Sequence, residues 1–440
     1  MSETLGQPGT TSTSILGNPV LRREDDALVR GQGEYVGNVP LEGALHAHFV
    51  RSTTAHGTIE SIEVDDARSM PGVVAVYTAA DLGLDDRPVT MGFYPSEMGR
   101  SFLARDRVRF VGEPIAVVVA ESPYLAADAA EMIWADIEPL PPVLDLADAL
   151  AGNTVLFPDL GHNVAFRNAV EDPIDFSGYE VVVTEDVANS RVAAVSIEPR
   201  VVAASIVDGR LTCWASSQGA HSFRQAVAEI LGLEPEDMRV YVKDIGGGFG
   251  AKGVPSEEEV MVVYLARLLE RPVRWTETRT ENLTGYVHGR AQDQKVTIAG
   301  TRDGDIQAYR LELIQDSGAY PKYGAFLPEF TRQMASGVYD IGRVELEFAS
   351  VVTTTAPICA YRGAGRPEAT AAIERAVDLF AAEIGMDPAE VRRRNLPSPD
   401  AFPFTNGTGT VYDSGEYERA LDVALEAADY AGLRAEQQRR

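Results

Sequence analysis

Residues 244–252 read DIGGGFGAK, and the rest of the sequence is best interpreted outward from this stretch. Four of the five residues at 246–250 are glycine, and Phe249 is the one that carries a side chain. Glycine loses more conformational freedom on folding than any other residue, so such a run indicates a backbone that passes very close to another group. The residues before it alternate like a strand, and a helix N-cap is expected at Ser256. The stretch is therefore predicted to be a strand-to-helix loop, whose backbone N–H groups can cradle an anion.

On its own, this loop fits several kinds of site. A Walker-type phosphate loop would need Ser or Thr after Lys252, where this sequence has Gly253, so that interpretation fails. A dinucleotide fingerprint is nominally matched, because Gly246, Gly248 and Ala251 spell GxGxxA. A dinucleotide-binding oxidoreductase is therefore one alternative. A glycine turn that packs closely and binds nothing is another.

A second loop, far along the chain, repeats these features. Residues 358–369 read ICAYRGAGRPEA, in which Gly363 and Gly365 again precede a helical pattern. Arg362 and Arg366 flank this turn, and arginine suits paired hydrogen bonds to anions. Two glycine-rich loops at helix entrances, distant in sequence, suit a large ligand that is held from two sides.

A third polar segment, WASSQGAH at 214–221, precedes another expected helix. Its Gln218 offers an amide that can both donate and accept hydrogen bonds. We expect Gln218, residues 246–250 and residues 361–365 to line a common cleft, although they are far apart in the sequence.

Composition narrows the class of protein. The chain has 440 residues, a formal net charge of −27 and 45% hydrophobic residues, which fits an ordinary globular protein of more than one domain. The acidic balance argues against nucleic acid, whose phosphates attract clustered Lys and Arg. Only Cys213 and Cys359 occur, too few for an iron–sulfur cluster, and both are expected to be buried. The N-terminal residues lack the features of a signal peptide and no apolar run could span a bilayer, so a cytoplasmic protein without membrane insertion is expected.

The patterning predicts an α+β chain. Hairpins are expected to turn at 208–209 and at 303–304, and a helix is expected to start with Ser222 as N-cap. The sequence at 415–430 is typical of a single amphipathic helix. His46 and His48 share one strand face, but no third ligand lies near them, so they are expected to be exposed strand residues and not a metal site.

The segments at 216–224, 244–252 and 357–369 together resemble the large subunit of the xanthine dehydrogenase and aldehyde oxidase family of molybdenum hydroxylases. The resemblance is closest to the branch that contains the large chains of aerobic carbon monoxide dehydrogenase, and it covers nearly the whole chain. It implies an α/β hammerhead domain followed by a mixed α/β molybdopterin-binding domain. The expected divisions are a disordered tail at 1–25, the hammerhead domain at 26–150, a linker at 151–162, the first molybdopterin-binding domain at 163–406, and a linker and helix at 407–440 that lead to a second molybdopterin-binding domain.

The resemblance also implies roles for the loop residues. Gln218 would hydrogen-bond a ligand of the molybdenum, and Arg362 would approach the metal and the substrate, so these two are the candidate catalytic residues. No protein side chain is expected to coordinate the metal itself. The candidate cofactor-binding residues are Gln218, Gly246, Gly247, Gly248, Phe249, Gly250, Ala360, Tyr361, Arg362, Gly363, Ala364 and Gly365.

The implied activity is the oxidation of an aldehyde or an aromatic heterocycle, with water as the source of oxygen. The implied cofactor is a molybdenum–molybdopterin group, expected as a pterin dinucleotide. Electrons would leave through iron–sulfur clusters and FAD, which partner subunits must carry because this chain lacks the cysteines.

Two departures from the family's pattern matter. Members that oxidise carbon monoxide carry a cysteine directly after the AYR residues, where this chain has Gly363, so carbon monoxide is not the expected substrate. The family's general-base glutamate comes from the second molybdopterin-binding domain, and this sequence ends at Arg440, before that domain. Glu113 is expected to support a turn and not to act as this base. A separately encoded C-terminal half is therefore an expected partner, and a non-catalytic half that binds cofactor or serves as an assembly scaffold is an alternative.

Overall fold

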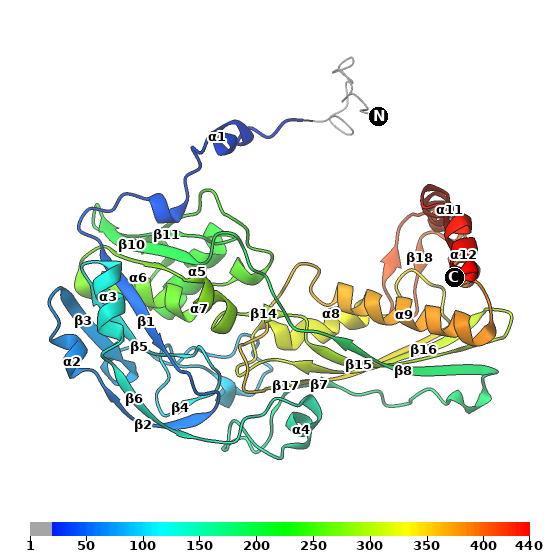
Figure 1. Cartoon of the computed structure of the whole chain (residues 1–440), viewed down its shortest axis with the longest axis horizontal. Coiled ribbons are helices and arrows are strands. Elements are labelled where there is room, and N and C mark those ends of the chain that lie inside the picture. Colours follow the sequence, from blue (N-terminus) through cyan, green and yellow to red (C-terminus); the bar gives the residue numbers. More distant parts are fainter. Residues whose placement is uncertain (1–19) are drawn as a thin grey trace.

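The computed structural model describes residues 20–440. Most of the tail expected at 1–25 lies outside these residues, and the first described helix, α1, covers Asp25–Val29. The molecule is elongated, with one large sheet at each end (Figure 1). Among the described residues, no helix is both long enough and apolar enough to cross a membrane.

The first sheet joins the two regions that the sequence separates. Its strand order is β12-β11-β10-β13-β1-β5-β3, so strands from before residue 150 and after residue 200 share one sheet. The junction is a parallel pairing of β1 with β13, in which Leu45 lies opposite Val273. The two expected domains are thus physically continuous through the interior of this sheet. The strands are β1 (Leu45–Arg51), β3 (Val73–Thr78), β5 (Pro114–Ala120), β10 (Val201–Val207), β11 (Arg210–Ala215), β12 (Met238–Tyr241) and β13 (Val273–Thr276).

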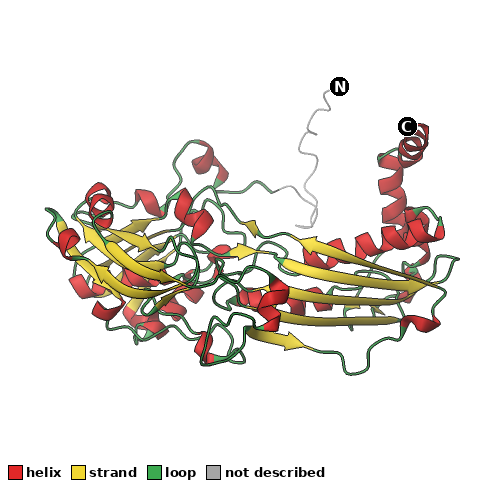
Figure 2. Ribbon diagram, turned by 60° about the horizontal axis from the view of Figure 1, so that its bottom comes forward, coloured by secondary structure: helices red, strands yellow, loops and turns green. Residues whose placement is uncertain are grey.

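The second sheet has five strands in the order β7-β17-β16-β15-β8. The long helix α9 packs on one face, where Val296, Tyr309 and Phe380 belong to one buried cluster. The opposite face is largely open, with α4 over one end (Figure 2). The strands are β7 (Val164–Asn168), β8 (Val181–Asn189), β15 (Gln292–Gly300), β16 (Ile306–Asp316) and β17 (Arg343–Val351).

Smaller sheets complete the fold. The three-stranded sheet β4-β2-β6 belongs to the N-terminal region, and β6, which ends at Pro139, lies at its edge, where a strand tolerates proline. Two short pairs, β9 with β14 and β18 with β19, lie farther along the chain. The strands are β2 (Gly57–Glu63), β4 (Arg107–Val108), β6 (Trp134–Pro139), β9 (Val192–Ala193), β14 (His288–Gly289), β18 (Phe404–Thr405) and β19 (Val411–Tyr412).

The helices agree with most of the sequence signals. Ser256 caps α6 in a reciprocal capping box with Glu259, as predicted. The helix expected to begin after Ser222 begins earlier, because Gly219 is its N-cap and the Ser222 hydroxyl donates to the Gly219 carbonyl. The remaining helices are α2 (Asp65–Arg68), α3 (Pro123–Ala130), α4 (Leu146–Ala151), α5 (Ala220–Ile230), α6 (Glu257–Leu269), α7 (Arg279–Thr284), α8 (Leu327–Gln333), α9 (Arg366–Ile384), α10 (Pro388–Arg394), α11 (Tyr417–Ala427) and α12 (Tyr430–Arg439).

The C-terminal segment forms the helix predicted within 415–430, as α11 (Tyr417–Ala427), and a second helix, α12 (Tyr430–Arg439), after it. Asp429 has a φ of +48°, which ends the first helical segment, and its side chain then caps α12. Neither α11 nor α12 contains a buried residue, and in Figure 1 the pair stands away from the sheet. The single helix predicted within 415–430 is therefore α11, and α12 is an additional helix that the sequence analysis did not predict.

Candidate cofactor site

The first glycine loop, residues 244–252, connects β12 to the segment that enters α6. Gly247, Phe249 and Gly250 have φ values of +102°, +53° and +96°, which a β-branched residue would adopt only under strain. Glu198 and Lys252 anchor the loop from one side. The Gly246 N–H donates to Glu198 Oε2 at 2.9 Å, and the buried Lys252 Nζ donates to the Glu198 carbonyl at 2.8 Å.

The second glycine loop, residues 359–366, leads directly into α9. Three residues in a row, Gly363, Ala364 and Gly365, have positive φ values of +97°, +42° and +85°. A Cβ on Gly365 would lie 2.7 Å from the Leu327 carbonyl oxygen, so this position has no room for a side chain. The helix then begins at Arg366, with a proline in its first turn as the sequence predicted.

The structure brings the three predicted elements together. Gln218 Oε1 accepts a hydrogen bond from the Gly250 N–H at 2.7 Å, and the Gln218 N–H donates to the Lys252 carbonyl at 3.0 Å. The Arg362 N–H donates to the Phe249 carbonyl at 2.9 Å, which joins the two glycine loops. A Cβ on Gly248 would lie 2.6 Å from Gln218 Oε1. The expected convergence of these segments is therefore a property of this fold.

A hollow of about 400 Å³ opens where the two glycine loops meet. Phe249 is 40% exposed at its edge, and Arg362 is also exposed. Within residues 20–440, the Arg362 guanidinium takes part in no ion pair or hydrogen bond, so its charge is free for a ligand. The lining residues are Phe249, Gly250, Ala360, Tyr361, Arg362, Gly363 and Ala364. Gln218 and residues 246–248 do not line the hollow themselves, but Gln218 is hydrogen-bonded to Gly250, which does.

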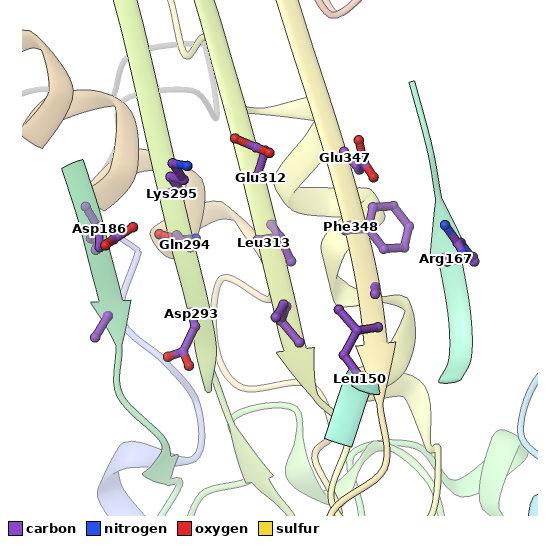
Figure 3. A pocket seen from close by; sticks show the side chains of 14 residues that line it. Leu150, Arg167, Asp186, Asp293, Gln294, Lys295, Glu312, Leu313, Glu347 and Phe348 are labelled. Atoms are coloured by element: carbon purple, nitrogen blue, oxygen red, sulfur yellow. The ribbon is translucent and has the colours of Figure 1, made fainter. Parts of the chain in front are cut away.

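A larger hollow of about 820 Å³ lies elsewhere, over the open face of the five-stranded sheet (Figure 3). Its charged side chains, which include Lys295, Glu312 and Glu347, stand in rows across neighbouring strands. Alternating charges on an open sheet face are typical of a solvated surface. None of the predicted site residues lines it, so size alone does not mark the site.

Sequence reasoning missed the side chains that hold these loops in place. Lys252 and Glu198 support the first loop, and Arg290 supports the second by donating to the carbonyls of Tyr361 and Arg362. The run of glutamates at 257–259 was also missed, although all three are buried. One signal was present in the sequence: three acids that open a helix as apolar as EEEVMVVYLARLL must find partners if that helix is buried.

These glutamates connect the region after residue 163 to the N-terminal region. Glu258 pairs with Arg51 of β1 and with Arg200, at 2.8 Å in each case. Glu257 lies within about 3 Å of Lys322, Arg100 and Arg87. The contact between the two regions is therefore a buried network of paired charges.

The charges in this network determine its pKa shifts. Burial would raise the pKa of Glu258, but the guanidinium groups of Arg200 and Arg51 outweigh it and hold the pKa below its ordinary value. Burial dominates at Glu259 and raises its pKa, with only partial compensation from Arg200 and Ser256. Burial also lowers the pKa of Lys252, against the attraction of Glu198.

Three other expectations concern residues away from the loops. Glu113 is buried and accepts hydrogen bonds from the Arg109 N–H at 2.6 Å and the Tyr320 hydroxyl at 2.7 Å, so it supports a turn as expected. Cys213 and Cys359 are both buried, also as expected. His46 and His48 are half-buried and not exposed, because helix α3 packs over this strand. No cluster of three or more candidate metal-binding side chains occurs in the described part of the chain.

Comparison with protein families assigns both regions. Residues 156–396 match the family described as "Molybdopterin cofactor-binding domain". Residues 30–141 match the family described as "Aldehyde oxidase and xanthine dehydrogenase, a/b hammerhead domain".

Individual relatives agree with this assignment. The chain is 35% identical over 441 residues to the carbon monoxide dehydrogenase large chain of Hydrogenophaga pseudoflava, with coverage of 94% of this chain and 54% of that relative. It is similar to the crystal structure of quinoline 2-oxidoreductase from Pseudomonas putida 86, with a TM-score of 0.91, 35% identity, and coverage of 96% of this chain and 55% of that chain. It thus spans about half the length of these two proteins.

A third relative has a different length. The nicotinate dehydrogenase large molybdopterin subunit of Eubacterium barkeri is 27% identical over 428 residues, which cover 96% of this chain and 99% of that relative. The matches to both family descriptions, in the order that the fold displays, confirm the resemblance inferred from the three segments. This chain belongs to the xanthine dehydrogenase and aldehyde oxidase family of molybdenum hydroxylases, whose hammerhead domain and molybdopterin cofactor-binding domain it contains.

Proposed function

We propose that this chain is the molybdenum-cofactor-binding part of a hydroxylase that oxidises an aldehyde or an aromatic heterocycle with water as the source of oxygen. The observation that carries the proposal is the junction of Gln218, the first glycine loop and the second glycine loop at one hollow. The bound cofactor would supply the redox chemistry and an activated oxygen. Iron–sulfur and FAD subunits would take up the electrons, and the whole assembly would be cytoplasmic.

The residues at the hollow fit a bulky, anionic pterin group. The glycines keep both loops free of side chains where they meet, since a Cβ on Gly250 would lie 2.8 Å from the Ala360 carbonyl oxygen. Phe249 offers an exposed ring as a flat surface, and Arg362 offers an unpaired guanidinium for a phosphate or a polar substrate group. Gln218 is held by its own backbone and side-chain hydrogen bonds, so its amide is preorganised. The phosphates of a pterin dinucleotide would suit the backbone N–H groups of the two glycine loops.

The rest of the active site is proposed to come from a second molybdopterin-binding domain. Large apolar side chains are exposed beside the first glycine loop, including Ile197 at 92% and Val254 at 47% exposure. Burial of such side chains favours association with another domain. A separately encoded half is one proposed source of that domain. A scaffold that binds cofactor without catalysis remains the second candidate.

The test is the molybdenum and pterin content of the chain purified from a host that makes the cofactor. We expect the wild type to retain both, alone or with a C-terminal half. Gly248→Val should lose them, because its side chain would collide with Gln218. The reason is this contact and not backbone strain, since Gly248 is not among the residues with positive φ.

Gly253→Ala is the matched control. A Cβ at Gly253 meets nothing within 4 Å, and this glycine is only a few residues farther along the same segment. Equal cofactor content in Gly248→Val and Gly253→Ala, with both variants folded, would refute the proposal.

A further inference from the structure

Arg290 lies between β14 and β15 and contacts the second glycine loop. Its Nη1 donates to the Tyr361 carbonyl at 3.1 Å, and its Nη2 donates to the Arg362 carbonyl at 2.6 Å. The guanidinium carbon also lies 4.8 Å from the centroid of the Tyr361 ring. The neighbouring Gly289 makes this contact possible, because a Cβ there would lie 2.3 Å from the Tyr361 Cβ.

The backbone that carries Arg290 is strained and firmly held. Arg290 and Ala291 have φ values of +63° and +66°, which non-glycine residues seldom adopt. The buried Gln315 Nε2 donates to both of their carbonyls, at 2.9 and 3.1 Å. Arg290 Nη1 also lies 3.2 Å from the wholly buried Glu368 carboxylate in the first turn of α9. Because such strain persists only where surrounding contacts enforce it, the position of this guanidinium is fixed by the fold.

The contacts of Arg290 determine which way the loop's peptide groups point. In a planar trans peptide the C=O and the following N–H lie on opposite sides. The Tyr361 carbonyl faces Arg290, and the next N–H, that of Arg362, donates to the Phe249 carbonyl of the first loop. The Arg362 carbonyl also faces Arg290, so the N–H of Gly363 points away from it. That N–H donates to no acceptor within residues 20–440, and Gly363 lines the hollow.

We propose that Arg290 is a positioning residue for the cofactor site. By holding the carbonyls of Tyr361 and Arg362, it joins the two glycine loops and leaves the Gly363 N–H free to donate to an anionic or carbonyl oxygen of the ligand. The identity of that ligand rests on the proposed function, whereas the orientation of the loop does not. Arg290 itself does not line the hollow.

The first test needs no cofactor. Hydrogen–deuterium exchange of the purified chain should show roughly tenfold or faster exchange at residues 360–365 in Arg290→Ala, because two hydrogen bonds from a charged donor are lost. Arg290→Lys should be intermediate, since an ammonium keeps the charge beside Glu368 but lacks the two-pronged geometry. Arg375→Ala, which removes an exposed pair with Glu185, is the control and should match the wild type. Unchanged exchange at residues 360–365 in Arg290→Ala would overturn the proposal.

The second test is cofactor retention at matched fold stability. Molybdenum content should fall in the order wild type, Arg290→Lys, Arg290→Ala, with the unfolding midpoint of Arg290→Lys close to that of the wild type. If Arg290→Ala does not fold, the molybdenum content of Arg290→Lys alone tests the proposal. Arg290→Lys could fold, show faster amide exchange at residues 360–365 than the wild type, and still retain all of its molybdenum. That result would contradict the proposal that Arg290 orients the loop for the ligand. If the wild type retains no molybdenum, the proposed function fails, while the exchange experiment still decides the role of Arg290.

Discussion

The two sides of the molybdopterin-binding region differ in how their charged side chains are paired and how their apolar side chains are buried. Toward the hammerhead domain, Glu257 and Glu258 are buried and paired with arginines and a lysine from both regions. At the glycine loops, Ile197 and Phe249 are exposed and Arg362 has no charged partner within the described chain. The first side has its buried glutamates paired, whereas the second leaves an arginine and apolar side chains exposed, although Lys252 and Arg290 behind its loops are paired with Glu198 and Glu368.

This difference distinguishes contacts that are made within the chain from a surface that, under the proposed function, another domain would cover. A buried charge without a partner is costly, so the pairing of Glu258 with Arg51 and Arg200 indicates an interface made within this chain. An exposed apolar rim around a hollow, next to an unpaired arginine, has the features of half a binding site. The predictions below test this contrast, beginning with the largest expected effect.

The largest effect concerns turnover. Residues 1–440 alone, loaded with cofactor, should oxidise aldehydes and purines at least ~10²–10⁴-fold more slowly than an intact family enzyme, because no general base can be assigned at the loops. The assay uses an artificial electron acceptor, so the absence of partner subunits does not limit it. Carbon monoxide should also fail as a substrate. Turnover close to that of an intact enzyme would show that residues 1–440 already contain a complete active site at the glycine loops.

The next effect concerns the side that faces the hammerhead domain. Glu258→Ala removes one of the two carboxylate partners of Arg51 and of Arg200, which keep Glu281 and Glu277, so it should lower the free energy of unfolding by about 3 kcal/mol. Asp86→Ala breaks the exposed pair with Arg105 and should change it by only about 0–1 kcal/mol. Denaturant unfolding of both variants gives the comparison. Equal effects would mean that burial does not distinguish the two pairs.

Two adjacent glutamates should give opposite pH dependence. The folded-state pKa of Glu258 lies below its ordinary value of 4.5, so its contribution to stability is present above pH 4.5 and lost as pH falls through the folded pKa. The pKa of Glu259 is raised, so its contribution is present below pH 4.5 and lost as pH rises through the folded pKa.

Unfolding free energies of Glu258→Gln and Glu259→Gln, measured between about pH 3 and pH 7, test this sign. Glu258→Gln should flatten the loss of stability on acidification below pH 4.5. Glu259→Gln should instead remove a loss of stability that develops as pH rises above 4.5. Identical profiles for the two variants would show that their surroundings do not differ as described.

The smallest effect on stability is expected at the loop side. Ile197→Ser should alter the free energy of unfolding by no more than about 0.5 kcal/mol, because this side chain is already exposed. It should nevertheless weaken association with a C-terminal half, measured by the dissociation constant of the pair. A large loss of stability in the chain alone would show that Ile197 makes an internal contact. The two sides of the region would then not differ as described.

Much of the site could be predicted because glycine and capping signals are local. The runs at 246–250 and 363–365 indicated their loops, and Ser256 with Glu259 indicated the start of α6. Each of these depends on a few neighbouring residues and on backbone preferences. The resemblance to the family added the order of the domains, and it placed Gln218 beside the glycine loops, where the structure has it.

The anchors of those loops could not be predicted, because they come from distant parts of the chain. Arg290 meets Tyr361 across 71 positions, and Glu198 meets Lys252 across 54. The continuous sheet formed by β1 and β13 likewise depends on a pairing that no local pattern encodes. The start of α5 was misplaced for a simpler reason: Ser222 looked like the cap, whereas the glycine three residues earlier fills that position.

The most direct test of the central claim is the position of molybdenum in the protein. Crystals of the chain purified with cofactor, together with a C-terminal half where one is available, can be measured on both sides of the molybdenum absorption edge. We expect an anomalous difference peak at the hollow where residues 246–250 and 360–365 meet, close to Gln218. A peak over the open face of the five-stranded sheet, or a cofactor-loaded protein whose metal lies away from both glycine loops, would contradict the account.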